Sequence, residues 1–174
     1  MPGCAHSAAK QYRVFRRKSK NEMPTFNRRL NDLLVDTFNI IAKIEEVSIK
    51  RAGHDLTVSE AHILEAVARQ AESGRTIGDI ADELFITPPS VTVAINKLVK
   101  KGYVTKERDE TDARKVYVRL TDKGMQMDRF HRYFHKKLVS NIASGLSEEE
   151  KSALYEAMLK MNKFFEERLL KEKP

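Results

Sequence analysis

The segment Thr76–Thr121 contains two closely spaced helix-start signals, and it constrains the fold more than any other part of the chain. Thr76 and Asp79 have the spacing of a capping box, in which each side chain accepts a hydrogen bond from the other residue's backbone amide. Thr87 is a second N-cap, and Pro88 follows it at the first helical position, where proline is favoured. The segment therefore begins with two predicted helices joined by a tight turn.

The second of these helices has one apolar face and one polar face. Apolar residues recur at positions i, i+4, i+7 and i+8, which is the pattern of a buried helix face: Val91, Ile95, Leu98 and Val99. Gly102 ends the helix, and two runs of strand-forming residues then flank a charged turn at residues 109–114. Two helices followed by a hairpin with a basic tip form the layout of a winged helix-turn-helix, whose second helix enters the major groove of DNA.

The hairpin and the preceding helix end also carry a family resemblance. Asp112–Thr121 resembles the D-x-R…V-x-L-T wing of MarR-type transcriptional regulators, and Leu98–Tyr103 is similar to that family's L-x-x-x-G-[YWL] helix end. The resemblance extends from about residue 25 to the end of the chain. It implies that the wing arginine, Arg114, contacts DNA and that Asp112 orients a neighbouring basic group.

The predicted DNA-contacting residues fall into two groups. The first group lies on the polar, small-residue face of the second helix, where base edges have room to approach: Thr87, Pro89, Ser90, Thr92, Asn96 and Lys97. The second group lies on the wing and is expected to contact the backbone or the minor groove: Arg108, Asp112, Arg114 and Lys115.

Net charge supports this prediction only where it is local. The chain of 174 residues has a formal charge of +7, but residues 1–23 hold six of its cations and one acid, so the remainder carries only +2.

The single cysteine, Cys4, excludes a disulfide framework within one chain and fits a reducing compartment. No apolar run approaches the roughly 20 residues that span a bilayer, and residues 1–22 lack the apolar region of a secretory signal. We therefore expect a cytoplasmic protein without a membrane partner.

The predicted fold is mainly α with a small β-wing: a winged helix-turn-helix with long helical dimerisation arms. Residues 1–23 form a basic extension that is predicted to be disordered, and it is either a phosphate-binding arm or sequence upstream of a natural start at Met23. Residues 24–56 form an N-terminal dimerisation helix, 57–121 the DNA-binding domain and 122–174 the C-terminal dimerisation helices. The apolar stripes of these long helices cannot all pack against one small domain, so the sequence predicts a homodimer that reads palindromic double-stranded DNA.

A histidine group is a candidate metal site. His131 and His135 are spaced i, i+4 and lie on one side of a helix, and His62 begins an earlier helix. With the carboxylate of Glu46 they could complete a tetrahedral zinc shell. The alternative is that the histidines are hydrogen-bonded or solvated side chains on a cationic helix face. No cofactor is required by the fold, and zinc is the candidate ion.

The resemblance points to two kinds of MarR-type repressor. Zinc-responsive members share the positions of His62, His131 and His135. Repressors of fatty-acid biosynthesis genes are more similar in the segments 44–48, 60–62 and 130–137, and the resemblance implies that they respond to long acyl chains on acyl carrier protein. We therefore expect a DNA-binding repressor of lipid-synthesis genes, with a zinc-responsive repressor as the alternative.

Two functions of other classes are less favoured. A metal-dependent hydrolase would use the histidines, but no nucleophile–base pairing or phosphate-cradling loop accompanies them, so the chain is not expected to be an enzyme. A winged-helix protein-interaction module would keep the fold and lack salt-sensitive DNA affinity.

Replacing the wing arginine gives a direct test of DNA binding. Arg114→Ala is expected to weaken operator binding by roughly 1–3 kcal/mol, as the loss of an arginine inserted into a groove should. Affinity is measured at fixed salt, with circular dichroism as the check that the variant is folded. An unchanged affinity in a folded variant would remove Arg114 from the interface.

Overall fold

The computed structural model describes residues 25–70, 73–109, 112 and 115–172. The predictions made for residues 1–23 therefore lie outside the described residues. The long helix that was predicted to follow them is present. The chain divides into two compact units at Lys43 and Ile44, within the first long helix. All of the winged helix-turn-helix belongs to the second unit.

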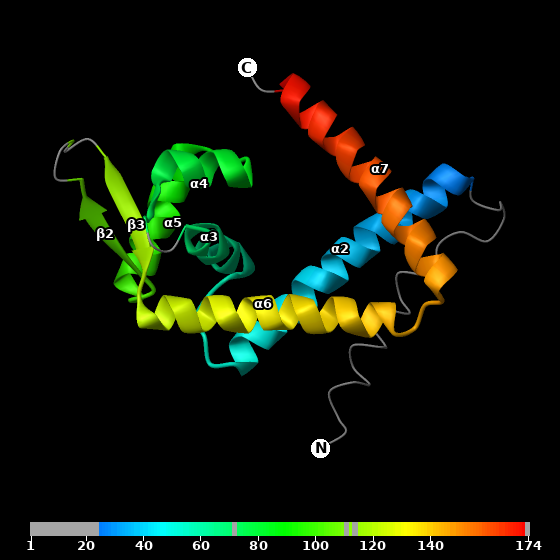
Figure 1. Ribbon diagram of the computed structural model, residues 1–174, viewed down its shortest axis with the longest axis horizontal. Coiled ribbons are helices and arrows are strands. Elements are labelled where there is room, and N and C mark those ends of the chain that lie inside the picture. The colour runs from blue at the N-terminus through cyan, green and yellow to red at the C-terminus, as the bar shows by residue number, and fades with distance from the viewer. Residues whose placement is uncertain (1–24, 71–72, 110–111, 113–114, 173–174) are drawn as a thin grey trace. The chain divides into compact units, whose positions relative to one another are not determined.

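The described elements follow one another in the predicted order, and most of them are helices (Figure 1). They are α2 (Phe26–Arg51), α3 (Val58–Ala68), β1 (Arg75–Thr76), α4 (Ile77–Leu84), α5 (Pro88–Lys100), β2 (Val104–Arg108), β3 (Val116–Leu120), α6 (Asp122–Ala143) and α7 (Glu148–Glu172). A mainly α fold with a small β-wing is thus confirmed. None of the described helices combines the length and apolarity that a bilayer span requires.

The helix starts of the DNA-binding domain are set by local capping, as predicted. The side chain of Thr76 accepts from the amide of Asp79 at 3.2 Å, and the carboxylate of Asp79 accepts in return from the amide of Thr76 at 3.1 Å. Thr87 caps α5 through the amide of Ser90. Between the two helices Phe85 takes the left-handed conformation, with φ 54°, so the turn is tight enough to set α5 across α4.

The sheet has three strands, whereas the sequence predicted only a two-stranded hairpin. β3 lies between β1 and β2 and is antiparallel to both, with Val118 opposite Arg75 on one side and Lys106 on the other. β1 contains only two residues, too few to show the alternation by which a strand is recognised in sequence. Its pairing fixes the wing to the start of α4.

Helix α3 forms the centre of the second unit, where it packs against α4, α5, α6 and β3. The core draws apolar side chains from all of these elements. Its fully buried members include Leu64, Val67, Ile80, Val91, Ile95, Leu98, Tyr103, Val118 and Met127. Because α5 contributes one face to this core, its other face is left for a partner.

The junction between the wing and α6 depends on a close approach of two backbone segments. Thr121 caps α6, and its amide and hydroxyl both donate to the carbonyl of Tyr103, at 3.0 and 3.1 Å. This places Gly124 so near the same carbonyl that a Cβ atom there would lie 2.2 Å from the oxygen. Only glycine fits at this position without a backbone shift.

Gly124→Ala is therefore expected to destabilise the protein by about 1–3 kcal/mol, as overpacking a buried site does. Gly78→Ala is the matched control, because Gly78 is exposed within α4 and the nearest atom to its added Cβ would be 3.7 Å away. Thermal unfolding followed by circular dichroism compares the two variants. Equal melting temperatures would show that the junction can relax.

Candidate nucleic-acid interface and histidine cluster

Helix α5 separates the residues of the core from those predicted to meet DNA. Val91, Ile95 and Leu98 are fully buried on one side. On the other side the predicted contact residues are exposed, apart from Thr92, which is half-buried: Thr87, Pro89, Ser90, Asn96 and Lys97. The hydroxyl of Thr92 donates to the carbonyl of Pro88 at 2.9 Å, so it already has a partner within the helix. The structure thus gathers this group of predicted residues on one surface.

The wing supplies the second group. Arg108 ends β2 and is exposed, and Lys115, just before β3, is exposed as well. Asp112 is half-buried in the turn between them, where its amide donates to the carboxylate of Asp109 at 2.9 Å. Arg114 lies outside the described residues, so its predicted DNA contact stays a prediction.

A contact between the wing and α5 was not predicted. The ammonium group of Lys106, on β2, donates to the side-chain oxygen of Asn96 at 2.6 Å. The two residues are ten positions apart, and only the pairing of the wing against α5 brings them together. This contact fixes how the amide of Asn96 is presented.

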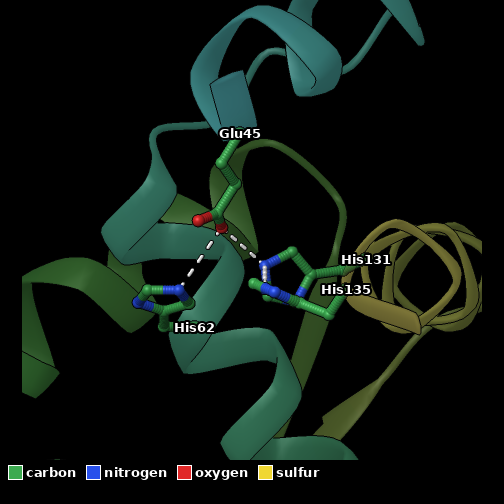
Figure 2. A group of neighbouring side chains, drawn as sticks. All are labelled: Glu45, His62, His131 and His135. Atoms are coloured by element: carbon green, nitrogen blue, oxygen red, sulfur yellow. Dashed lines mark hydrogen bonds and ion pairs between the residues drawn. The ribbon is translucent and has the colours of Figure 1, made fainter. Parts of the chain in front are cut away.

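The three predicted histidines converge with one carboxylate, as Figure 2 shows. Nε2 of His131 lies 2.6 Å from Oε1 of Glu45, and Nε2 of His62 lies 3.3 Å from the same oxygen. Nε2 of His135 lies 3.1 Å from Nε2 of His131. All four ligand atoms lie within 4.8 Å of one another, and they come from α2, α3 and α6. We refer to these four residues as the histidine cluster.

Burial affects the members of the histidine cluster differently. Glu45 and His131 are almost completely buried, whereas His62 is about half exposed. Burial, together with the nearby charge of His131, lowers the pKa of His135. This shift favours the neutral ring, which is the form that can bind a metal ion.

The carboxylate of the cluster was predicted wrongly. Glu45, not Glu46, faces the histidines, and Glu46 forms a salt bridge of 2.5 Å with Lys50 one turn along α2. Adjacent helical residues point about 100° apart, so only one of the two glutamates can face α3 and α6. The sequence placed Glu46 at the right height along α2 but did not fix the rotation of the helix.

The short contacts of the histidine cluster depend on which nitrogen of His131 carries its proton. Nδ1 of His131 lies 3.2 Å from Oε2 of Glu65, so a proton at Nδ1 leaves a lone pair at Nε2. That lone pair would then face both the Glu45 carboxylate and Nε2 of His135. A proton carried at Nε2 instead, donated to Glu45, or a metal ion among the four atoms would remove this repulsion.

The donor set fits a zinc ion. Three imidazole nitrogens and one carboxylate oxygen are ligands that zinc takes in tetrahedral sites. Zn–N distances of about 2.0–2.1 Å correspond to ligand atoms roughly 3.3 Å apart. Two separations in the cluster, 3.3 Å and 3.1 Å, are close to this value, whereas the 2.6 Å between Nε2 of His131 and Oε1 of Glu45 is shorter. Glu65 at Nδ1 of His131 is the kind of carboxylate that orients a metal-binding histidine.

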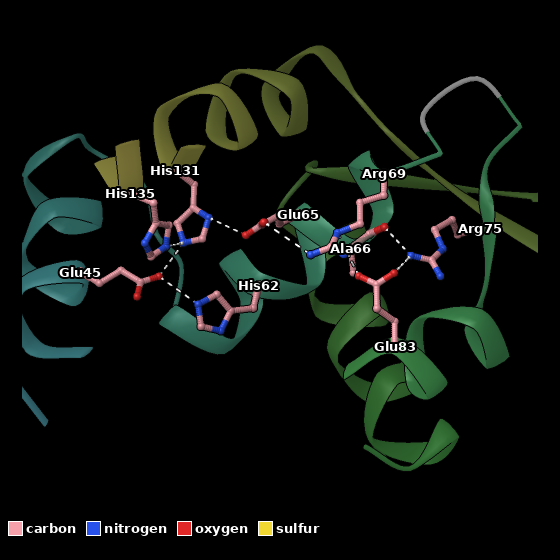
Figure 3. Close-up of polar contacts among 9 residues, drawn as sticks. All are labelled: Glu45, His62, Glu65, Ala66, Arg69, Arg75, Glu83, His131 and His135. Carbon is pink, nitrogen blue, oxygen red and sulfur yellow. Dashed lines mark hydrogen bonds and ion pairs between the residues drawn. The ribbon is translucent and has the colours of Figure 1, made fainter. Parts of the chain in front are cut away.

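A chain of charged side chains continues from the cluster to the helix-turn-helix (Figure 3). Glu65 lies 3.8 Å from Arg69 on α3, and Nε of Arg69 lies 3.2 Å from Oε1 of Glu83 on α4. Glu83 in turn pairs with Arg75. This series of ion pairs connects α6, α3, α4 and β1.

Arg75 is a buried residue that sequence reasoning missed. Its guanidinium group donates to the carbonyls of Ala66 and Asp79, each at 3.0 Å, and to the carboxylate of Glu83. Burying an arginine requires such partners. The signal in sequence was slight: a lone arginine directly before a helix cap.

Comparison with known proteins identifies the fold and the family. The family model described as MarR family matches residues 54–115. The crystal structure of Streptococcus pneumoniae FabT in complex with DNA has a TM-score of 0.77 and 32% sequence identity, covering 81% of this chain and 98% of that chain. The uncharacterized HTH-type transcriptional regulator YkoM of Bacillus subtilis is 27% identical over 75% of this chain and 86% of its own. The transcriptional regulator ZitR of Lactococcus lactis is 29% identical over 57% of this chain and 68% of its own.

Two neighbouring glutamates give a matched test of metal binding. Glu45→Gln is expected to weaken zinc binding at least about tenfold, because losing even a hydrogen-bond partner of a metal ligand costs about 10–100-fold. Glu46→Gln should leave zinc affinity unchanged, since that side chain pairs with Lys50 instead. Competition with a coloured chelator measures both affinities. Equal affinities, or no zinc bound by the unmodified protein, would favour a cluster held by hydrogen bonds between His131 and Glu45.

Proposed function

The chain belongs to the MarR family of transcriptional regulators, and from this premise we propose that it is a homodimeric repressor that binds palindromic operators and controls genes of fatty-acid synthesis. The observation that carries DNA binding is the outward face of α5, with its exposed polar and basic residues beside the wing. The FabT structure, of which the match covers 98%, is a complex with DNA.

Dimerisation is supported by the apolar side chains of the long helices. In α2 the exposed residues include Phe26, Leu33 and Phe38, at 77%, 63% and 62% exposure. In α7 the exposed apolar residues recur along its length: Leu154, Tyr155, Met158, Leu159, Phe164, Phe165 and Leu170. Apolar patches of this extent mark protein interfaces. A twofold dimer would place two copies of α5 to read two half-sites.

Lipid control is supported by the sequence resemblance and by the surface of α6. The segments 44–48, 60–62 and 130–137 are most similar to repressors of fatty-acid biosynthesis genes. Four exposed cations lie along α6, together with the exposed apolar residues Tyr133 and Val139: Arg129, Arg132, Lys136 and Lys137. A basic surface of this kind complements an acidic carrier protein. The proposed effector is a long acyl chain carried on acyl carrier protein.

Each methylene of a bound chain that leaves water contributes about 0.8 kcal/mol. An acyl group that is buried in only one of two dimer conformations can therefore change their ratio, and with it the affinity for DNA. The histidine cluster would then have a structural role in this function, joining α2, α3 and α6 through the contacts of His62 and His131 with Glu45.

A second candidate function is favoured by one observation, the convergence of three Nε2 atoms and one carboxylate oxygen in the histidine cluster. Under this proposal the protein is a zinc-responsive repressor, and Glu45, His62, His131 and His135 hold the ion. Bound zinc would draw α2, α3 and α6 together by supplying four ligand bonds among them.

One experiment distinguishes the two candidates. Operator affinity is measured by fluorescence anisotropy at fixed salt, with carrier protein bearing chains of C8 to C18, with unloaded carrier protein, and with zinc or a strong chelator. A change in DNA affinity that grows with chain length is expected, and zinc should have no effect. Lys136→Glu and Lys137→Glu should reduce the response to loaded carrier protein, since both remove cations of α6.

The opposite pattern would identify the zinc-responsive repressor. There a chelator alone would change operator binding, and Glu45→Gln would reproduce its effect while Glu46→Gln would not. A protein that responds to neither agent would have a different effector.

A further inference from the structure

An exposed valine lies within the polar face of α5. Val93 is 56% exposed, although its helix buries Val91 and Ile95 completely. The residues one turn before and after it, Pro89 and Asn96, are exposed and belong to the predicted DNA-contacting group. Val93 is therefore placed among groups that face the DNA, and it contributes little to the core.

The chemistry of the major groove limits what an apolar side chain can recognise there. Base edges present hydrogen-bond donors and acceptors, and the apolar group among them is the C5-methyl of thymine. A valine methyl in contact with that group removes apolar surface from water on both sides. The same valine facing a cytosine, an adenine or a guanine would gain no such contact.

The neighbouring side chain narrows the recognition further. Lys106 donates to the side-chain oxygen of Asn96 at 2.6 Å, and an ammonium group can only donate. One lone pair of the Asn96 oxygen is therefore already used by Lys106, while the amide NH₂ remains a donor. This donor suits an acceptor such as thymine O4, which lies beside the C5-methyl on the same base.

We propose that Val93 is a specificity-determining residue that contacts the C5-methyl of a thymine in each half-site, with the Asn96 amide donating to an acceptor beside it. This inference rests on the proposed DNA-binding function and names the base chemistry that α5 reads. Removing the methyl group from one half-site should weaken binding about fourfold, which corresponds to the ~0.8 kcal/mol of one buried methyl-sized group.

The test removes single methyl groups from the DNA. An operator is first selected from a random-sequence library with the full chain, and each thymine is then replaced in turn by deoxyuridine, which lacks only the C5-methyl. At one symmetry-related pair of positions the affinity should fall about fourfold per half-site. The affinity of Val93→Ala for the unmodified operator should match the affinity of the unmodified protein for the operator with deoxyuridine at both positions of the pair. Replacing these thymines by deoxyuridine should no longer change the affinity of Val93→Ala.

Val99→Ala is the matched control, because Val99 is a partly exposed valine on another side of the same helix. It should keep the full response to deoxyuridine. If no thymine is sensitive, or if Val93→Ala remains as sensitive as the unmodified protein, this inference is wrong and DNA binding stands. If no operator can be selected, the proposed function itself is wrong, and the inference is lost with it.

Discussion

The buried guanidinium group of Arg75 joins the parts of the DNA-binding domain. It donates to a carbonyl of α3, to a carbonyl of α4 and to the carboxylate of Glu83, while its backbone pairs with β3 opposite Val118. One side chain therefore fixes the central helix, the first helix of the helix-turn-helix and the sheet that carries the wing. Removing one partner from a buried ion pair is costly, because the remaining charge stays desolvated. Polar contacts of a buried residue thus help to set the relative position of α4 and the wing.

DNA recognition depends on the position of α5, which is set by its contacts with the rest of the domain. Three fully buried side chains hold it to the core, and the left-handed turn at Phe85 fixes its direction from α4. The hydrogen bond between Lys106 and Asn96 then joins the wing to the reading surface. A groove-reading helix that is held on one face and at its start presents its outward residues in one orientation, which is what discrimination between base edges requires.

Local features were predictable from sequence, and features that depend on helix rotation or on distant pairing were not. The N-caps Thr76 and Thr87 act within three residues, so their sequence signals are complete. The spacing of His131 and His135 is equally local. The choice of Glu45 over Glu46 depends on how α2 rotates against α3 and α6, which no local pattern states. β1 and the partners of Arg75 arise only once the sheet and core are assembled.

Contacts connect the histidine cluster to the DNA-reading surface, but contacts alone do not couple the two sites. Glu65, Arg69 and Glu83 connect Nδ1 of His131 to α4 through separations of 3.2, 3.8 and 3.2 Å (Figure 3). For a signal to pass, Glu65 must have two arrangements, and the state of His131 must favour one of them. A zinc ion at Nε2 would strengthen the contact between Nδ1 of His131 and Glu65, because metal binding would make an Nδ1 proton a better donor. Moving α6 against α3 is one change that would separate His131 from Glu65, because the two residues lie on these two helices.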